Sequence, residues 1–135
     1  MKVYIYISAG GFIGSIFRYI TTNINWGYYS GNFPIGTLFV NIIGAFLLLI
    51  ISTFISEYFH IDDYLKKGIV TGFFGAYTTF STLCKETNSL IINKYYADAT
   101  VYLILSILLG IGATYSGFFI AHKLITNVIK KKDKI

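Results

Sequence analysis

The stretch that decides the fold is residues 35–56, which read IGTLFVNIIGAFLLLIISTFIS and carry no charged side chain. A helix that crosses the hydrocarbon core of a bilayer, roughly 30 Å thick, needs about 20 predominantly apolar residues. This run meets that requirement without interruption. It therefore predicts a membrane-spanning helix, and the chain on either side can be read with the same test.

Outward from this run, three further apolar stretches reach the same length: residues 3–22, 68–92 and 99–120. The stretch at 68–92 differs from the others because polar residues interrupt it. The segments between the four stretches are too short to fold alone. We therefore predict an all-α membrane protein with four transmembrane helices and a single transmembrane domain over residues 1–135. A basic tail over about residues 123–135 follows the fourth span.

The composition agrees with a membrane protein. Of the 135 residues, 55% are hydrophobic and only 13% are charged, whereas a soluble domain of this length needs more charge to cover its surface. The net charge of +5 could indicate a nucleic-acid site, but the basic residues flank the apolar runs. That placement is typical of contacts with anionic lipids, so we expect no nucleic-acid partner.

The sequence shows no sign of an enzyme. It contains no Walker motif and no convincing catalytic constellation. Cys84 is the single cysteine, which excludes an intrachain disulfide, and His60 and His122 lie too far apart to show metal-ligand spacing. We therefore expect no catalytic residues.

The basic residues are distributed unevenly about the four spans. An even number of spans places both termini on one side of the membrane, and that side collects Lys2, Lys66, Lys67, Lys123, Lys130, Lys131, Lys132 and Lys134. The opposite side holds Lys94, because Arg18 and Lys85 lie within or near spans. The positive-inside rule then predicts a multi-pass plasma-membrane protein with both termini in the cytoplasm and one orientation only.

Residues 72–86, which read GFFGAYTTFSTLCKE, are unusually polar for the middle of a span. Glycines, β-branched threonines and hydroxyl groups disfavour a continuous helix, so we predict a break between Ala76 and Phe80. Non-helical backbone at membrane depth must be buried in protein or line a wet cavity. Its carbonyl groups could coordinate a hard cation. The alternative is a continuous helix whose hydroxyl groups bond back to its own carbonyl groups.

Several polar side chains elsewhere in the spans have both a functional and a structural interpretation. Glu86 is an intramembrane carboxylate, which suggests a functional site, although the adjacent Lys85 is equally consistent with an interface. Thr37 and Asn41 share one helix face, where the amide can donate to an anion or simply bond another helix. Arg18 can extend to the lipid phosphates or guard an anion vestibule.

Small residues recur at four-residue spacing, which lets helix backbones approach closely. The pairs are Gly10 with Gly14, Gly68 with Gly72, and Ala113 with Gly117. In a small glycine-rich membrane protein this pattern indicates helix faces that are buried against a partner chain.

Three ordered segments together resemble a known family. Residues 10–19 (GGFIGSIFRY), 36–44 (GTLFVNIIG) and 72–86 are similar to the motifs of the first, second and broken third helices of the CrcB/Fluc fluoride channels. With four spans and a matching length, the resemblance covers essentially the whole chain. It implies a passive channel that exports cytoplasmic fluoride and confers fluoride resistance.

The resemblance also implies an architecture: an antiparallel, inverted-topology dimer with two pores and a structural sodium ion at the dimer interface. Carried onto this chain, backbone carbonyl groups of Gly75 and Thr78 would hold the sodium ion. Asn41 would donate to fluoride, with Thr37 nearby, and Phe80 would present the positive edge of its ring. The remaining pore positions would be Ser81, Thr82 and Glu86 after the break, and Tyr102 and Ser106 on the fourth span, with Arg18 at a vestibule or interface.

One position departs from the family pattern. The family commonly has a second phenylalanine three residues after the first, and this chain has Leu83 there. A protein that inserts in both orientations should also show almost no lysine bias, yet this chain is strongly biased. We therefore hypothesise a heterodimer with a homologous subunit of opposite orientation, while a homodimer in which Leu83 is a tolerated substitution stays open.

Two other functions remain possible from the sequence. The chain could be a non-conducting assembly or regulatory subunit that binds another membrane protein through its glycine faces. It could also be a small proton-coupled transporter that uses Glu86.

Overall fold

The computed structural model describes residues 1–24, 32–58 and 61–132, apart from the side chains of 129, 131 and 132. His60 and Lys134, which entered the sequence argument, lie outside these residues. All regular structure in the described part is helical: α1 (Lys2–Thr22), α2 (Ile35–Glu57), α3 (Asp63–Lys67), η1 (Gly68–Phe74), α4 (Gly75–Tyr77), α5 (Phe80–Ile92) and α6 (Tyr96–Lys132).

Three of the four apolar runs form uninterrupted helices. Within the described residues, α1, α2 and α6 as far as Val128 are long and apolar enough to cross a membrane. The fourth span is longer than the apolar run suggests, because α6 begins at Tyr96 and continues through the basic tail to Lys132. No proline or glycine follows Gly117 in this helix, so nothing in the sequence ends it at the membrane boundary.

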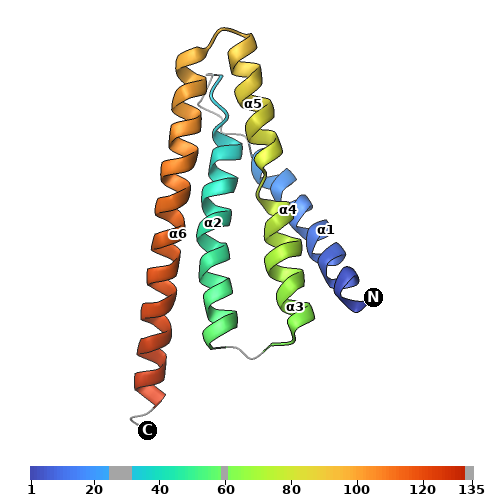
Figure 1. Cartoon of the computed structure of the whole chain (residues 1–135), viewed down its shortest axis with the longest axis vertical. Coiled ribbons are helices and arrows are strands. Elements are labelled where there is room, and N and C mark those ends of the chain that lie inside the picture. The colour runs from blue at the N-terminus through green and yellow to red at the C-terminus, as the bar shows by residue number, and fades with distance from the viewer. Residues whose placement is uncertain (25–31, 59–60, 133–135) are drawn as a thin grey trace.

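The third apolar run is broken, as the sequence predicts. It forms η1 and α4, which continue the preceding α3 as one column, and then the separate helix α5 (Figure 1). The break is narrower than the predicted interval, because only Thr78 and Thr79 are extended. Neither half reaches the length of a spanning helix alone. The seven residues of η1 form a π-helix, a rare conformation that often lies near functional sites and that the sequence did not predict.

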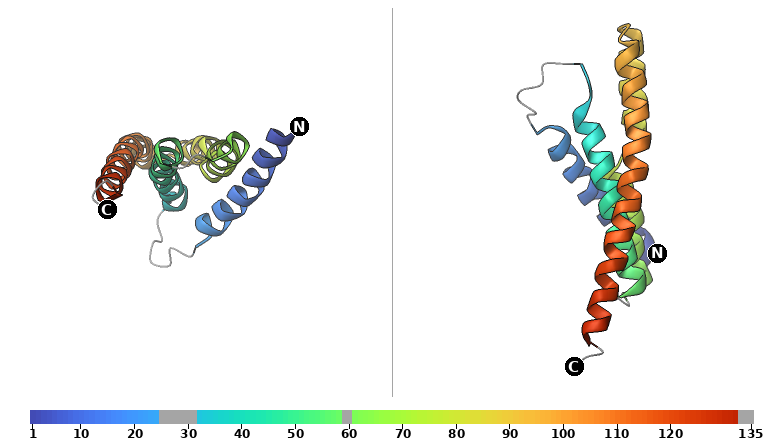
Figure 2. Two further views of the ribbon diagram at one scale, coloured as in Figure 1. Left: turned by 90° about the horizontal axis from the view of Figure 1, so that it is seen from below. Right: turned by 90° about the vertical axis from the view of Figure 1, so that its left-hand side faces the viewer.

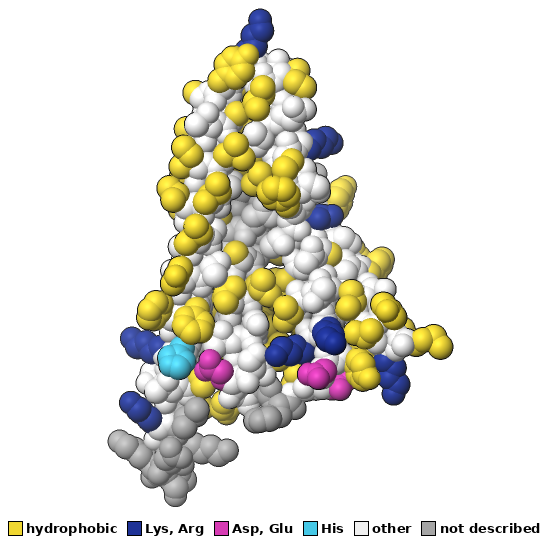
Figure 3. All heavy atoms as spheres, viewed as in Figure 1, with side chains coloured by type: hydrophobic (Ala, Val, Ile, Leu, Met, Phe, Trp, Pro, Cys, Tyr) yellow, Lys and Arg dark blue, Asp and Glu magenta, His cyan; other side chains and the backbone are white. Residues whose placement is uncertain are grey.

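The ends of the helices sort into two groups. The N-terminus, the C-terminal end of α2, helix α3 and the C-terminal end of α6 lie towards one end of the molecule, and the α5–α6 connection lies at the other (Figure 1). In the face shown in Figure 3, Lys and Arg side chains gather mainly at the first of these ends. This arrangement is the one that an even number of spans requires.

The helices pack as two pairs. Helix α2 runs along α6, and α1 crosses the column of η1 and α4 (Figure 2). Glycines allow the second contact, because a Cβ added at Gly10 or Gly14 would collide with the carbonyl groups of Gly68 and Phe73 respectively. At Gly117 of α6 an added Cβ would lie 2.6 Å from the carbonyl oxygen of Phe46. The small residues expected at a partner interface therefore serve contacts within the chain.

The chain buries few large side chains. Among the described residues, only Tyr102, Phe74 and Val40 are large and essentially inaccessible. Many large apolar side chains on α1 and α6 are instead exposed, among them Phe12, Tyr19, Ile107 and Phe119. Hydrophobic side chains are spread along the whole length of the face seen in Figure 3. Such a surface is stable in contact with lipid or with another apolar protein surface.

Candidate functional site

Thr79 is the residue around which the helix break is built. Thr78 and Thr79 have extended backbone angles, with ψ of 156° and 117°. Thr79 then caps the next helix, since its Oγ1 accepts a hydrogen bond of 3.2 Å from the backbone N–H of Thr82. This is the usual role of a threonine at a helix N-terminus, where the first N–H groups lack helical acceptors.

Asn41 of α2 closes the break from the opposite side. Its Nδ2 donates to the carbonyl oxygen of Thr79 at 3.0 Å, and its Oδ1 accepts from the backbone N–H of Thr79 at 2.8 Å. The amide therefore pairs with both polar groups of one residue, as a neighbouring strand would. We call this pair of bonds the Asn41–Thr79 clasp. It satisfies backbone groups that would otherwise be unpaired at membrane depth.

The clasp and the Thr79 cap together take the helical donors away from the two carbonyl groups that the family resemblance assigns to sodium. In a continuous helix the carbonyl of Gly75 would accept from the N–H of Thr79, and that of Thr78 from the N–H of Thr82. Here the first N–H donates to Asn41 and the second to the side chain of Thr79. Gly75 is exposed and Thr78 is half-buried. Carbonyl oxygens in this situation suit a hard cation.

A cluster of hydroxyl groups surrounds the start of α5. The Oγ1 of Thr79 lies 3.2 Å from the Oγ of Ser81 and 2.9 Å from the Oγ1 of Thr82. The structure thus brings together the two predicted residues, Ser81 and Thr82, with Thr79, which was not among the predicted site residues. A threonine placed three residues before Thr82 at the expected break was the signal that could have identified this cap.

Glu86 is the centre of a second network, which joins three helices. The Oγ1 of Thr37 donates to its Oε1 at 2.8 Å, and the hydroxyl group of Tyr102 donates to its Oε2 at 2.7 Å. Ser106 extends the network along α6, where its Oγ donates to the carbonyl of Tyr102 at 2.7 Å. Thr37 and Tyr102 are buried, whereas Glu86 is half-buried, so the two donors are shielded from solvent more fully than the carboxylate.

The carboxylate of Glu86 is thus held by hydroxyl groups and not by a cation. Among the described residues the single ion pair joins His122 and Glu57 across 3.4 Å, far from this network in the sequence. Lys85 is exposed and takes no part. Of the two readings of the Lys85–Glu86 dipeptide, the inward-facing carboxylate describes the structure better than an interfacial ion pair.

Two predicted residues lie outside both networks. Phe80 follows the break directly, but its side chain is 79% exposed on the surface of the chain. Arg18 is half-buried on α1, and within the described residues its guanidinium group forms no ion pair or hydrogen bond, although its carbonyl oxygen accepts from Oγ1 of Thr22. A role for either residue in a pore therefore requires a surface that the single chain does not supply.

Leu83 has a structural environment of its own. It is half-buried and packs with Phe33 and Leu38 against a core of Leu90, Ala99 and Tyr102. The ring of Phe33 meets that of Tyr102 edge to face, with centroids 5.5 Å apart. The position is therefore part of the packing that holds Tyr102 against Glu86.

Comparisons with known proteins agree with this architecture. The family model described as "CrcB-like protein, Camphor Resistance (CrcB)" matches residues 5–118. A protein of Flavobacterium psychrophilum named "Fluoride-specific ion channel FluC" is 36% identical over 124 residues, which cover 92% of this chain and 100% of the relative. One of Bacteroides fragilis with the same name is 39% identical over 126 residues, covering 91% and 98%.

A third relative, "Fluoride-specific ion channel FluC 1" of Staphylococcus aureus, is 37% identical over 114 residues, covering 84% of this chain and 92% of the relative. The match of the family model includes the second apolar run, the broken helix and most of the first and fourth runs. The chain therefore belongs to the CrcB family of membrane proteins.

Proposed function

We propose that this chain is a subunit of a fluoride-selective channel that lets cytoplasmic fluoride leave the cell passively. The observation that carries the proposal is the pair of half-buried polar networks around Asn41 and Glu86, both at the broken helix of a membrane protein. The choice of fluoride as the ion rests on the names of the relatives, which are fluoride-specific ion channels. Hydroxyl and amide groups at membrane depth are the donors that a small anion needs in place of water.

No energy source is needed for this function. Hydrogen fluoride, a weak acid, crosses bilayers as a neutral molecule and ionises at cytoplasmic pH, which traps the anion. A membrane potential that is negative inside then drives fluoride out at about 2.3 kcal/mol per 100 mV. A selective pore is sufficient for resistance to fluoride.

Asn41 can serve both the clasp and an anion. Its Nδ2 carries two hydrogens, and one bond to Thr79 leaves the other for a fluoride ion. Ser81 and Thr82 would add hydroxyl donors. Thr37 would lie nearby, with its single hydroxyl hydrogen donated to Glu86. On α6, Tyr102 and Ser106 would continue the pathway beside Glu86.

Phe80 and Arg18 would act at the surface between two chains. The exposed ring of Phe80 would offer its positive edge to the anion once a second subunit covers it. Arg18 would lie at a vestibule or at the interface. Both assignments need the dimer, which we propose is antiparallel.

A sodium ion would have a structural role at the dimer interface. Gly75 and Thr78 would hold it through their carbonyl oxygens, and the exposure of Gly75 suits a contact between chains. A hard cation takes more oxygen ligands than two, so a second chain would complete its coordination.

The uneven distribution of lysine favours two unlike subunits. With both termini in the cytoplasm, the basic ends of α1, α3 and α6 hold this chain in one orientation. We therefore propose that a homologous subunit of reversed bias supplies the antiparallel partner.

Fluoride efflux from proteoliposomes, followed with a fluoride electrode under a potassium diffusion potential, tests the proposal. We expect selective efflux when this chain is reconstituted with its homologous partner, and chloride in place of fluoride is the control.

Efflux with this chain alone would exclude the obligate heterodimer but keep the channel. No efflux in either preparation would leave an assembly subunit as the better description. Efflux that depends on a proton gradient and disappears in Glu86→Gln would indicate a transporter.

Asn41→Asp provides a sharper test of the donor. The new carboxylate keeps an acceptor for the N–H of Thr79 but puts a negative charge where the anion would bind. We expect fluoride efflux to fall at least about tenfold, since like charges repel strongly in a low dielectric. Unchanged efflux would remove Asn41 from the pore.

A further inference from the structure

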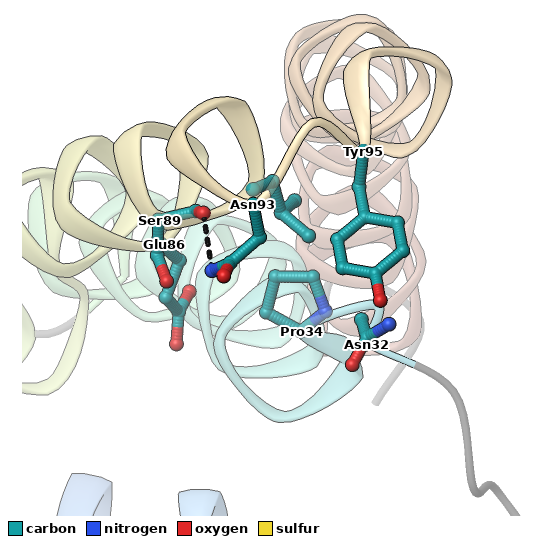
Figure 4. Close-up of a pocket in the computed structure, with 7 residues that line it drawn as sticks. Asn32, Pro34, Glu86, Ser89, Asn93 and Tyr95 are labelled. Carbon is teal, nitrogen blue, oxygen red and sulfur yellow. Dashed lines mark hydrogen bonds between the residues drawn. The ribbon is translucent and has the colours of Figure 1, made fainter.

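A polar pocket opens at the end of the molecule that carries the α5–α6 connection. Its volume is about 280 Å³. It is lined by residues that precede α2, residues of α5 and the turn before α6, namely Asn32, Pro34, Glu86, Ser89, Leu90, Asn93 and Tyr95 (Figure 4). A cavity with this many polar groups and this volume holds several water molecules, each of which occupies about 30 Å³.

The pocket meets the Glu86 network from outside. Glu86 lines the pocket, whereas its two hydrogen-bond donors, Thr37 and Tyr102, do not. The carboxylate therefore stands at the boundary between a wet cavity and the buried hydroxyl groups. The pocket borders directly on that network, so a hydrated ion that entered here would reach it at Glu86.

Donors for an anion lie on the wall of this pocket. The Nδ2 of Asn93 donates to the carbonyl of Ser89 at 2.8 Å, and its second hydrogen is available to a ligand. Figure 4 shows Asn93 between α5 and the segment before α2, in the middle of the lining residues. The hydroxyl groups of Ser89 and Tyr95 add two further donors.

Lys94 stands between two lining residues in a conformation that lysine rarely adopts. Its φ is 64°, and it is the only described non-glycine residue with a positive φ. The end of α5 is closed by bonds from Lys94 N to Ile91 O at 3.0 Å and from Tyr95 N to Leu90 O at 2.9 Å. In this motif the left-handed position is usually glycine, so folding alone does not favour a lysine here.

The positive charge of Lys94 offers a reason why lysine stands at this position in place of glycine. Between Glu86 and Lys123 the sequence holds no other lysine or arginine, and Asp98 is the only carboxylate. A positive charge beside the pocket raises the local concentration of anions and offsets the repulsion from Glu86.

Given the proposed fluoride channel, we infer that this pocket is the mouth of the anion path at the Lys94 end. Ser89 and Asn93 replace part of the water around the ion, and Lys94 attracts it. The pocket lies within one subunit, so an antiparallel pair has one such mouth on each side of the membrane.

Cysteine modification tests the position of the mouth. In a Cys84→Ser background, Ser89→Cys places a thiol in the pocket, and Asn88→Cys places one on the neighbouring exposed residue, which does not line it. A membrane-impermeant, positively charged thiol reagent on both sides should reduce fluoride efflux about tenfold or more for Ser89→Cys, because the adduct fills the cavity. Asn88→Cys should retain its efflux.

Mass spectrometry establishes whether each cysteine is modified. A Ser89→Cys protein that resists the reagent, or that is modified and conducts as before, would overturn the inference. If the unmodified wild-type channel conducts, such a result leaves the proposed function intact. If wild type does not conduct with or without a partner, the proposed function itself has failed.

Lys94→Gly separates charge from folding. Glycine suits the left-handed position, so the thermal unfolding midpoint should rise, while fluoride efflux at low ionic strength should fall about threefold. Lys94→Arg should retain the efflux of wild type. The difference in efflux between Lys94→Gly and wild type should shrink in high salt, because the charge of Lys94 is then screened. Equal efflux of Lys94→Gly and wild type at low salt would remove Lys94 from the mouth.

Discussion

The two sides of the broken column are held by opposite means. Against α1, the half formed by η1 is fixed by backbone contacts at glycines such as Gly14, with no room for a side chain. Against α2 and α6, the break and α5 are fixed by side-chain hydrogen bonds of Asn41, Thr37 and Tyr102. The contact with α1 depends on close backbone packing, whereas the contacts with α2 and α6 depend on hydrogen bonds. A channel needs both, because a rigid support must hold polar groups that stay available to an ion.

The largest effect should come from filling the close-packed contact with α1. In Gly14→Ala the new Cβ collides with the backbone of Phe73, which cannot move aside like a flexible side chain. We expect a loss of about 3 kcal/mol or more in the free energy of unfolding, measured by thermal unfolding in detergent. Gly112→Ala is the matched control, because no neighbouring atom of the described residues lies within 4 Å of its added Cβ. Similar unfolding midpoints for the two variants would contradict the distinction.

Removal of the clasp should have the next largest effect. Asn41→Leu keeps an apolar helix face but leaves the N–H and carbonyl groups of Thr79 without their partners. The expected loss is about 2–4 kcal/mol, since each unpaired buried group costs roughly 1–3 kcal/mol. Hydrogen exchange at the Thr79 amide should become faster than in wild type. Unchanged exchange would show that Asn41 does not hold the break.

The cap of α5 should contribute less. Thr79→Ala removes the acceptor for the Thr82 N–H and the hydroxyl contacts with Ser81 and Thr82, with an expected loss of about 1–2 kcal/mol. Thr79→Ser keeps the oxygen and should lie within about 0.5 kcal/mol of wild type. Thermal unfolding of the two variants side by side checks this. If serine fails to restore the stability, the methyl group and not the cap is what matters.

The smallest of these effects should follow from Tyr102→Phe. The ring still packs against Phe33, but Oε2 of Glu86 loses its donor, which we expect to cost about 1 kcal/mol. Tyr115→Phe, at an exposed position of the same helix, should unfold like wild type. Equal midpoints for both variants would mean that water replaces the tyrosine hydroxyl at Glu86.

The spans and the break follow from local sequence, and most of the site does not. The uncharged run at 35–56 predicts a spanning helix and the threonines at 78–79 predict the break. Both predictions need only neighbouring residues, so both could be made from the sequence. Asn41 and Thr79 are 38 positions apart, and no local pattern says that this amide pairs with that peptide group. The role of the glycines was misjudged for the same reason, since spacing shows that a face is small but not which helix covers it. The packing of Leu83 likewise depends on Phe33, which is 50 positions away.

The unbroken course of α6 sets the position of the chain along the membrane normal. Its 37 residues extend about 55 Å at 1.5 Å per residue, whereas a bilayer with its headgroups is about 40–45 Å thick. At the average tilt of about 20° the helix still extends about 52 Å along the membrane normal, so its final turns, which carry Lys130, project beyond the headgroups as a helical post. In an antiparallel pair of unlike chains, this chain would project its helical post from one face of the membrane only. The two faces of the channel would then differ in shape as well as in charge.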